Sequence, residues 1–144
     1  MTRIHFGLLL PVIVICLINA PGRGQEERVY QSARAISGKE VRVALFGRAN
    51  GKECKALPIP EIRVVDPPKN GALIIRTASL TTNRYPNCPN LKVPAQVLFY
   101  QSRSDYVGSD SVSFTVTFEN GHVQAHSLAI TVAKDGQPSN AQDL

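Results

Sequence analysis

The sequence predicts an all-β domain, a two-sheet sandwich of about seven short antiparallel strands. Three observations lead to this prediction: short runs alternate apolar and polar residues, turn-forming residues separate the runs, and no helical apolar period follows residue 25. Successive side chains of a strand point to opposite faces, so a short alternating run indicates a strand with one buried face. Several such runs with turns between them are typical of a β-sandwich.

The clearest strand signal lies near the C-terminus. From Val112 to Phe118, Val and Phe alternate with Ser and Thr without interruption. The dipeptide Asn120-Gly121 follows, and both residues tolerate the positive φ that a tight type I′ turn requires. A second apolar run, from Val123 to Val132, then leads back. We therefore expect a long antiparallel hairpin.

A two-residue turn would also fix the register of this hairpin, with Phe118 opposite Val123. Continued without interruption, that register would turn the apolar residues from Leu128 onward to solvent. We therefore predict a β-bulge near His126-Ser127, which would return them to the core. A longer turn that resets the register, or a strand buried on both faces, is the alternative.

Five further strands are expected upstream, with Val41, Val43 and Leu45 on one face of the second. Turn chemistry is densest over 66–71, where two prolines precede an Asn-Gly step. Two longer segments, 47–57 and 78–94, are expected to be loops. The expected strands are 29–36, 40–46, 62–65, 73–77 and 96–101.

The expected domain covers residues 25–136, between a leader and a tail. Residues 1–24 resemble a secretory signal peptide, because basic Arg3 precedes a short apolar run over 6–18. That run is too short to span a bilayer as a helix, so no transmembrane segment is expected after cleavage. An uncleaved anchor is the alternative. Residues 137–144 are polar and are expected to be a disordered tail.

Two cysteines remain once the leader, with Cys16, is removed. In an exported protein, Cys54 and Cys88 most simply form one disulfide. Two cysteines are too few for a structural zinc site. The leader and the cysteine pair together predict a periplasmic or secreted protein.

Charge is distributed unevenly along the chain. Residues 28–103 contain 13 Lys and Arg and four Asp and Glu, a net charge of +9, whereas residues 104–144 carry −4. A basic face for an acidic partner is one interpretation, and a solvated surface of mixed sign is the other. The basic residues are scattered singly with no interleaved aromatic platform, so we expect no nucleic-acid partner.

Two segments resemble the bacterial immunoglobulin-like or cadherin-like domains of exported proteins. The sequence P-K-N-G-A-L, with Asn70 and Gly71, is similar to the turn by which those domains enter a strand. The second segment pairs Phe99-Tyr100 with Y-V-G-S-D-S-V-S-F, and contains Gly108 and Asp110. The resemblance covers residues 66–132 and implies an immunoglobulin-like fold in a single copy, but no activity. Gly108 would take the turn and Asp110 would cap it.

Candidate chemistry is sparse. His122 and His126 would lie too far apart on a strand to share one metal ion, so we expect two surface histidines. Asp105 and Asp110 lack the further oxygen ligands that calcium needs. The sequence contains the residue types of a hydrolytic triad in Ser127, His126 and Asp105, but no nucleophile elbow accompanies them. No catalytic residue, metal site or cofactor is predicted.

Two functional hypotheses follow. The first is a non-catalytic binding or structural module of the bacterial envelope, with an acidic envelope polymer or another envelope protein as its partner. The second is an enzyme acting on envelope polymers, with a site that the sequence does not reveal. Converging carboxylates in a deep polar pocket would favour the enzyme, whereas a basic face or an open sheet edge would favour the module.

Overall fold

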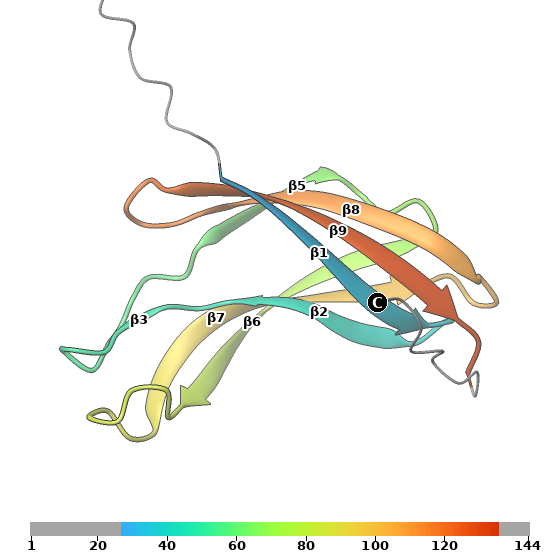
Figure 1. Cartoon of the computed structure of the whole chain (residues 1–144). Helices are drawn as coiled ribbons and strands as arrows, with labels where there is room; N and C mark the ends of the chain where they lie inside the picture. Colours follow the sequence, from blue (N-terminus) through green and yellow to red (C-terminus); the bar gives the residue numbers. More distant parts are fainter. Residues whose placement is uncertain (1–26, 136–144) are drawn as a thin grey trace, which may run out of the picture.

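The computed structural model describes residues 27–135, and all regular structure within that range is β-strand (Figure 1). The nine strands are β1 (Glu27–Ile36), β2 (Glu40–Phe46), β3 (Ala49–Asn50), β4 (Lys55–Ala56), β5 (Glu61–Asp66), β6 (Gly71–Thr82), β7 (Leu91–Ser102), β8 (Gly108–Thr117) and β9 (Val123–Ala133). The all-β prediction is confirmed for this part of the chain. The predicted leader, 1–24, and the predicted tail, 137–144, lie outside the described residues. No helix within 27–135 has the length and apolar character needed to cross a membrane.

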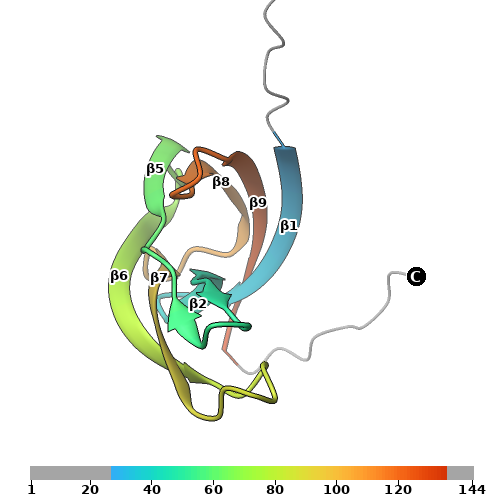
Figure 2. The ribbon, with the colours of Figure 1, turned by 90° about the vertical axis from the view of Figure 1, so that its left-hand side faces the viewer.

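The strands form two larger sheets and one small one. The order β1-β9-β8-β5 makes a four-stranded sheet, β2-β7-β6 makes a three-stranded sheet, and β3-β4 pair alone. The two larger sheets face each other as two layers, which is clearest in the view along their edges (Figure 2). The core between the layers combines Leu98 and Tyr100 of β7 with the inward side chains of the other sheet. Those include Ala35, Val112, Phe114, Val116, Leu128, Ile130 and Val132.

The pairing of β1 with β9 is parallel, which corrects the expectation of an entirely antiparallel sandwich. Glu27 lies opposite Gln124 and Ile36 lies opposite Ala133. Parallel neighbours require a long connection between them. Here the connection is almost the whole domain, because the first strand lies beside the last, and no local sequence pattern reports such a pairing.

The C-terminal hairpin is present, but its predicted β-bulge is wrong. The ladder between β8 and β9 is unbroken, with Phe114 opposite His126 and Val112 opposite Leu128. The register is reset by a longer turn instead: the Phe118 amide donates to His122 O at 2.9 Å, and the Gly121 amide donates to Phe118 O at 2.9 Å. Gly121 has a φ of 78°, the left-handed residue of a three-residue loop. One extra loop residue therefore brings Leu128 to the core without a bulge.

Strand β2 contains a bulge that the alternation in its sequence did not reveal. Its pairing with β7 shifts between Arg42 and Ala44. Beyond the shift, Ala44 and Phe46 pack on the core and Leu45 is 40% exposed. The expectation that Val41, Val43 and Leu45 share one buried face is therefore wrong for Leu45, because the extra residue reverses the faces of the strand.

Strands β6 and β7 are longer than predicted. The segment 78–94 was expected to be a loop, but the ladder runs from Gly71 opposite Ser102 to Thr82 opposite Leu91, and only 83–90 is a loop. Pro94 fits within β7 because it lies opposite Ser79, outside the hydrogen-bonded pairs of this ladder. The hairpin consequently projects past the rest of the fold at lower left in Figure 1.

Candidate binding site on the disulfide-linked arm

A projecting arm is the most distinctive surface feature. We define the arm as residues 47–57, which contain the β3–β4 hairpin, together with residues 78–95, the distal half of the β6–β7 hairpin. The two parts meet through apolar contacts: a Cβ added at Gly47 would lie 2.8 Å from Ala95 Cβ. Val93 and Ala95 are buried, at 5% and 0% exposed. The arm thus has a small core of its own.

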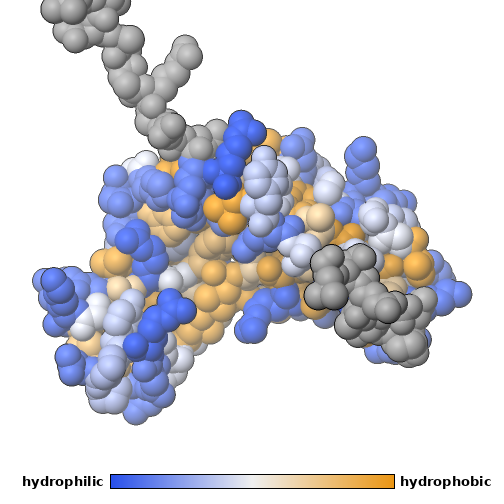
Figure 3. Space-filling view, viewed as in Figure 1, coloured by the Kyte–Doolittle hydropathy of each residue, from blue (hydrophilic) through white to orange (hydrophobic). Residues whose placement is uncertain are grey.

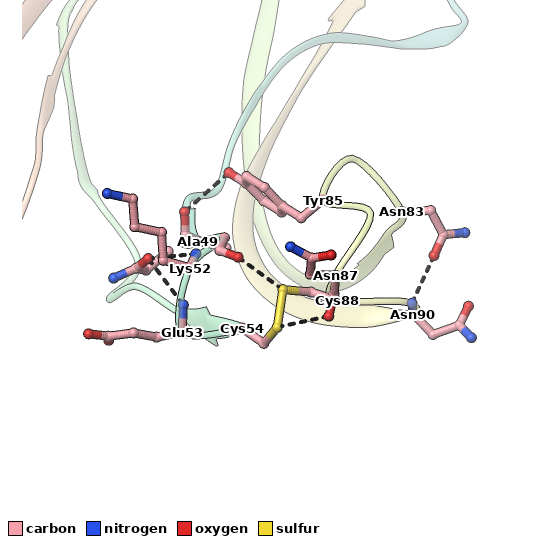
Figure 4. The surroundings of a disulfide bond; sticks show 11 residues. Ala49, Lys52, Glu53, Cys54, Asn83, Tyr85, Asn87, Cys88 and Asn90 are labelled. Carbon is pink, nitrogen blue, oxygen red and sulfur yellow. Dashed lines mark hydrogen bonds between the residues drawn. A yellow bond between two sulfur atoms is a disulfide. The ribbon is translucent and has the colours of Figure 1, made fainter.

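The predicted disulfide is present and joins the two parts of the arm. Cys54 and Cys88 are bonded, with their Cα atoms 5.3 Å apart (Figure 4). Cys88 is only 3% exposed, and its sulfur lies 3.2 Å from Gly51 O. The two cysteines are 34 positions apart in the sequence, so the bond restrains two loops that are distant in sequence.

Hydrogen bonds order both loops of the arm. Asn50 Oδ1 accepts from the amides of Lys52 and Glu53, at 3.0 and 3.4 Å. The Tyr85 hydroxyl donates to Ala49 O at 3.1 Å and crosses between the two parts of the arm (Figure 4). Tyr85 also lies so close to Gly51 that an added Cβ would be 2.1 Å from its ring. Gly51 is therefore needed for the packing of Tyr85.

The exposed charge on the arm is mostly positive. Four basic side chains are exposed and form no ion pair with a described residue: Lys52, Lys55, Arg84 and Lys92. The acidic residue on the arm is Glu53. Arg48, at its base, lies 3.6 Å from Glu119 and its guanidinium is 5.0 Å from the centre of the Phe118 ring. Figure 3 shows hydrophilic side chains over this projection.

Asp110 joins two of the turns singled out in the sequence at the other end of the layers, whereas Asn120 and Gly121 lie in the separate turn between β8 and β9. Oδ1 and Oδ2 of Asp110 accept from the amides of Lys69 and Asn70, at 3.0 and 2.9 Å. The turn that the Asp110 carboxylate caps is the one between β5 and β6, which corrects the expectation that it caps its own Gly108 turn. Gly108 has a φ of 142°, consistent with its expected role in the backbone turn.

Gly71 follows this turn and is required by close approach. A Cβ there would lie 2.5 Å from Gln101 O and 2.7 Å from the Tyr100 ring. The Tyr100 hydroxyl in turn donates to Asp110 Oδ2 at 2.9 Å. Burial alone would raise the pKa of Asp110, but the amides of Lys69, Asn70 and Ser111 and the Tyr100 hydroxyl outweigh it and lower the pKa. Asp110 is thus a structural carboxylate.

His126 is buried, which corrects the expectation of two surface histidines. Its ring stacks on Phe114 with centroids 5.0 Å apart and meets Phe46 edge-on at 5.0 Å. Burial lowers its pKa, and Glu27 opposes that shift. His122 is exposed as expected and lies 3.0 Å from Glu27. The ring of His126 therefore contacts aromatic side chains, and not Ser127 and Asp105 as a hydrolytic triad would require.

The outer face of the four-stranded sheet carries a shallow depression beside Tyr30. Its lining contains Ser111, Ser113 and Ser127, and no Asp, Glu, Lys, Arg or His. Within 27–135, no group of three or more His, Cys, Asp or Glu side chains could hold a metal ion. The arm, rather than this depression, combines charge with a fixed shape.

Comparison with known proteins gives little further information. No family model matches the chain, and no curated protein matches it. A solved structure entitled "Solution Structure of Amebosin" is similar with a TM-score of 0.44 and 8% identity, covering 76% of this chain and 100% of that one. A likeness this weak supports no statement about fold family or activity.

Proposed function

We propose that the chain is an exported, single-domain immunoglobulin-like binding module of the bacterial envelope, without catalytic activity. Its arm binds an acidic envelope polymer or the acidic surface of another envelope protein. The observation that carries this proposal is the set of four exposed basic side chains, without an ion-pair partner among the described residues, on the two parts of the arm that a disulfide joins: Lys52, Lys55, Arg84 and Lys92.

The strand order supports the immunoglobulin-like part of the proposal. An immunoglobulin sandwich places its second, fifth and fourth strands in one sheet and its third, sixth and seventh in the other. With the short β3 and β4 set aside as an insertion, β2-β7-β6 and β9-β8-β5 follow that order. The first strand, β1, then lies beside the last. The hydrogen bonds of Asp110 with the amides of Lys69 and Asn70 join the two segments that carry the resemblance, and this supports the proposal.

The physical chemistry of the arm favours a polyanion. Several exposed cations near one another create a positive potential that attracts a chain of negative charges and speeds the encounter. The disulfide and the Tyr85–Ala49 hydrogen bond already order the loops, so less conformational entropy is lost on binding. Lysine suits this role, because its ammonium group contacts anions as a point charge on a flexible stem.

The test compares two variants of equal net charge. In the arm variant, Lys52, Lys55 and Arg84 are each replaced by Gln. In the matched control, the exposed Arg28, Arg34 and Arg63 are replaced by Gln; these residues also form no ion pair with a described residue. Binding to two probes, polyphosphate and poly-glutamate, is measured by fluorescence anisotropy over a series of salt concentrations.

We expect the arm variant to bind at least one probe about tenfold or more weakly than the unmodified protein, and the control to lose much less. Binding should also weaken steeply with salt, since surface electrostatics are screened. Equal losses in both variants would mean that net charge, not the arm, attracts the polymer. Salt-independent binding, or no binding to either probe, would refute the proposal.

A further inference from the structure

The edges of the two larger sheets are protected unequally. The ladder of β2 is bulged between Arg42 and Ala44, and that of β5 between Val64 and Asp66. Edge strand β1 carries the exposed charges of Arg28 and Arg34. Bulges and charges are the devices by which natural sheets prevent another strand from pairing with an edge.

Strand β6 has neither device. It runs for 12 residues in an unbroken ladder with β7. Its charged residue, Arg76, is turned to its own sheet: the guanidinium holds Glu40 through two bonds, of 2.5 and 2.7 Å, and lies 4.8 Å from the centre of the Phe99 ring. The long edge of β6 therefore offers backbone groups with no net charge to repel a second strand.

The hydrogen-bond pattern shows which backbone groups face outward. The Arg103 amide donates to Asn70 O at 2.8 Å, which extends the β6–β7 ladder by one hydrogen-bonded pair. Such pairs alternate in an antiparallel ladder, so the even-numbered residues of β6 bond to β7. The odd-numbered residues direct their N–H and C=O groups away from β7, to the open edge; these are Gly71, Leu73, Ile75, Thr77, Ser79 and Thr81.

The same side of the molecule exposes apolar side chains between the layers. Ile75 lies opposite Leu98, and Val64 lies opposite Phe114, so both are directed toward the core side of their sheets. Each is nevertheless 37% exposed, and Val65 is 56% exposed. Three strands face four, and β5 and β6 are the edge strands on this side (Figure 2). A fourth strand beside β6 would extend the smaller sheet beneath β5.

We infer that β6 pairs with β6 of a second copy of this chain, antiparallel about a two-fold axis, to form a homodimer with a continuous six-stranded sheet. An isologous two-fold contact is the commonest route to a homodimer. Self-pairing suits this strand because the charge of Arg76 is already neutralised by Glu40 within its own chain. Residues 78–82 of the arm take part in this pairing, but the four exposed basic side chains of the arm lie outside β6.

Side-chain bulk selects the register. Two registers pair the greatest length of β6 with itself. One sets Arg76 opposite Arg76 of the other copy in a non-hydrogen-bonded pair, where the Cα atoms approach to about 4.5 Å, and there the two Arg76–Glu40 ion pairs crowd each other. The other has its axis at Thr77, and it sets Arg76 opposite Ala78 and Ile75 opposite Ser79. The second register is the one we assign.

The test begins with the full chain, expressed with its own leader. Light scattering over a concentration series should show the mass of the unmodified protein rising toward twice that of one chain. Thr77→Pro should keep it monomeric, because proline removes an N–H that points to the open edge and not to β7. The matched variant Thr77→Val retains the N–H and should dimerise like the unmodified protein.

A crosslinking pair tests the register and remains decisive if Thr77→Pro fails to fold. Cα atoms of hydrogen-bonded antiparallel partners are about 5.5 Å apart, a separation that a disulfide can bridge. Under mild oxidation Thr77→Cys should form a covalent dimer, and Ser79→Cys, which lies opposite Ile75, should not. A protein that is monomeric at all concentrations, a Thr77→Pro variant that dimerises normally, or a dimer linked through Ser79→Cys instead would overturn the inference.

Discussion

The hydroxyl of Tyr100 donates a hydrogen bond of 2.9 Å to Oδ2 of Asp110, and this bond connects the two sheets. Tyr100 belongs to β7 of the three-stranded sheet, whereas Asp110 belongs to β8 of the four-stranded sheet. The same carboxylate binds the amides of Lys69 and Asn70, in the turn by which the chain passes from β5 to β6. One buried side chain thus holds both layers and the connection between them.

Replacing Asp110 should therefore destabilise the fold strongly. Asp110→Ala leaves three backbone amides and a hydroxyl without their acceptor, and we expect the free energy of unfolding to fall by about 3 kcal/mol. Tyr100→Phe removes one of the four bonds and should cost about 1 kcal/mol. Urea denaturation measures both. The control is Glu53→Ala, an exposed residue of the arm, which should change stability by less than about 0.5 kcal/mol.

The pH dependence of stability should include a contribution from Asp110. Its folded-state pKa is lowered, so the carboxylate contributes stability that is fully present above the unfolded pKa of about 3.9 and is lost as pH falls through the folded value. Unfolding free energies of the unmodified protein and of Asp110→Asn are compared over the acid range. The difference between them should narrow below about pH 4, and a constant difference would contradict the assignment.

His126 should make the protein less stable at mildly acidic pH. Burial lowers its folded-state pKa, so the unfolded chain binds a proton first as pH falls below about 6.5, and stability decreases from that point downward. His126→Phe preserves the stack on Phe114 and should abolish the decrease. Thermal melts from pH 7.5 to about 5 measure it. His122→Gln, at an exposed position, should still lose stability over this pH range. If the decrease disappeared in His122→Gln, the effect would belong to His122 and not to His126.

Removing the disulfide should loosen the arm and lower stability. In the chain-entropy model, a bridge that closes a loop of this size contributes about 4 kcal/mol. The double variant Cys54→Ser, Cys88→Ser should therefore unfold at a lower urea concentration. Hydrogen exchange locates the change: amides of the arm should lose protection more than those of β8 and β9. Intact mass before and after alkylation without reductant checks the bond itself, and two alkylated thiols would show that the purified protein lacks it.

The sequence predicted the all-β class and the disulfide because both depend on local signals or simple counting. It failed at the hairpin register. Asn120-Gly121 fits a two-residue turn, yet the loop closes between Phe118 and His122. Adding one loop residue exchanges the two faces of β9. A two-residue turn predicts His126 on the solvent face, whereas the longer loop places it in the core.

The extent of β6 and β7 was missed for a different reason. Pro86, Pro89 and Pro94 indicate a loop, but Pro94 occupies a pair that needs no N–H toward β6, so the strand continues through it. The candidate site on the arm could not be predicted from the sequence either. Its basic residues belong to two segments that are distant in sequence, and the loops that carry Lys52 and Arg84 lie side by side only because the disulfide and the Tyr85–Ala49 hydrogen bond join them.

The parallel pairing of β1 with β9 determines how the fold responds to mechanical load. Glu27 lies at the hairpin end of the sheet, opposite Gln124, while Ala133 lies at the far end, opposite Ile36. The chain therefore enters and leaves the described fold at opposite ends of two neighbouring strands. Tension applied at those points acts along the strands. It loads their backbone hydrogen bonds in shear and all at once, instead of breaking them one after another. A domain stretched between two anchored attachments would resist extension through its first and last strands.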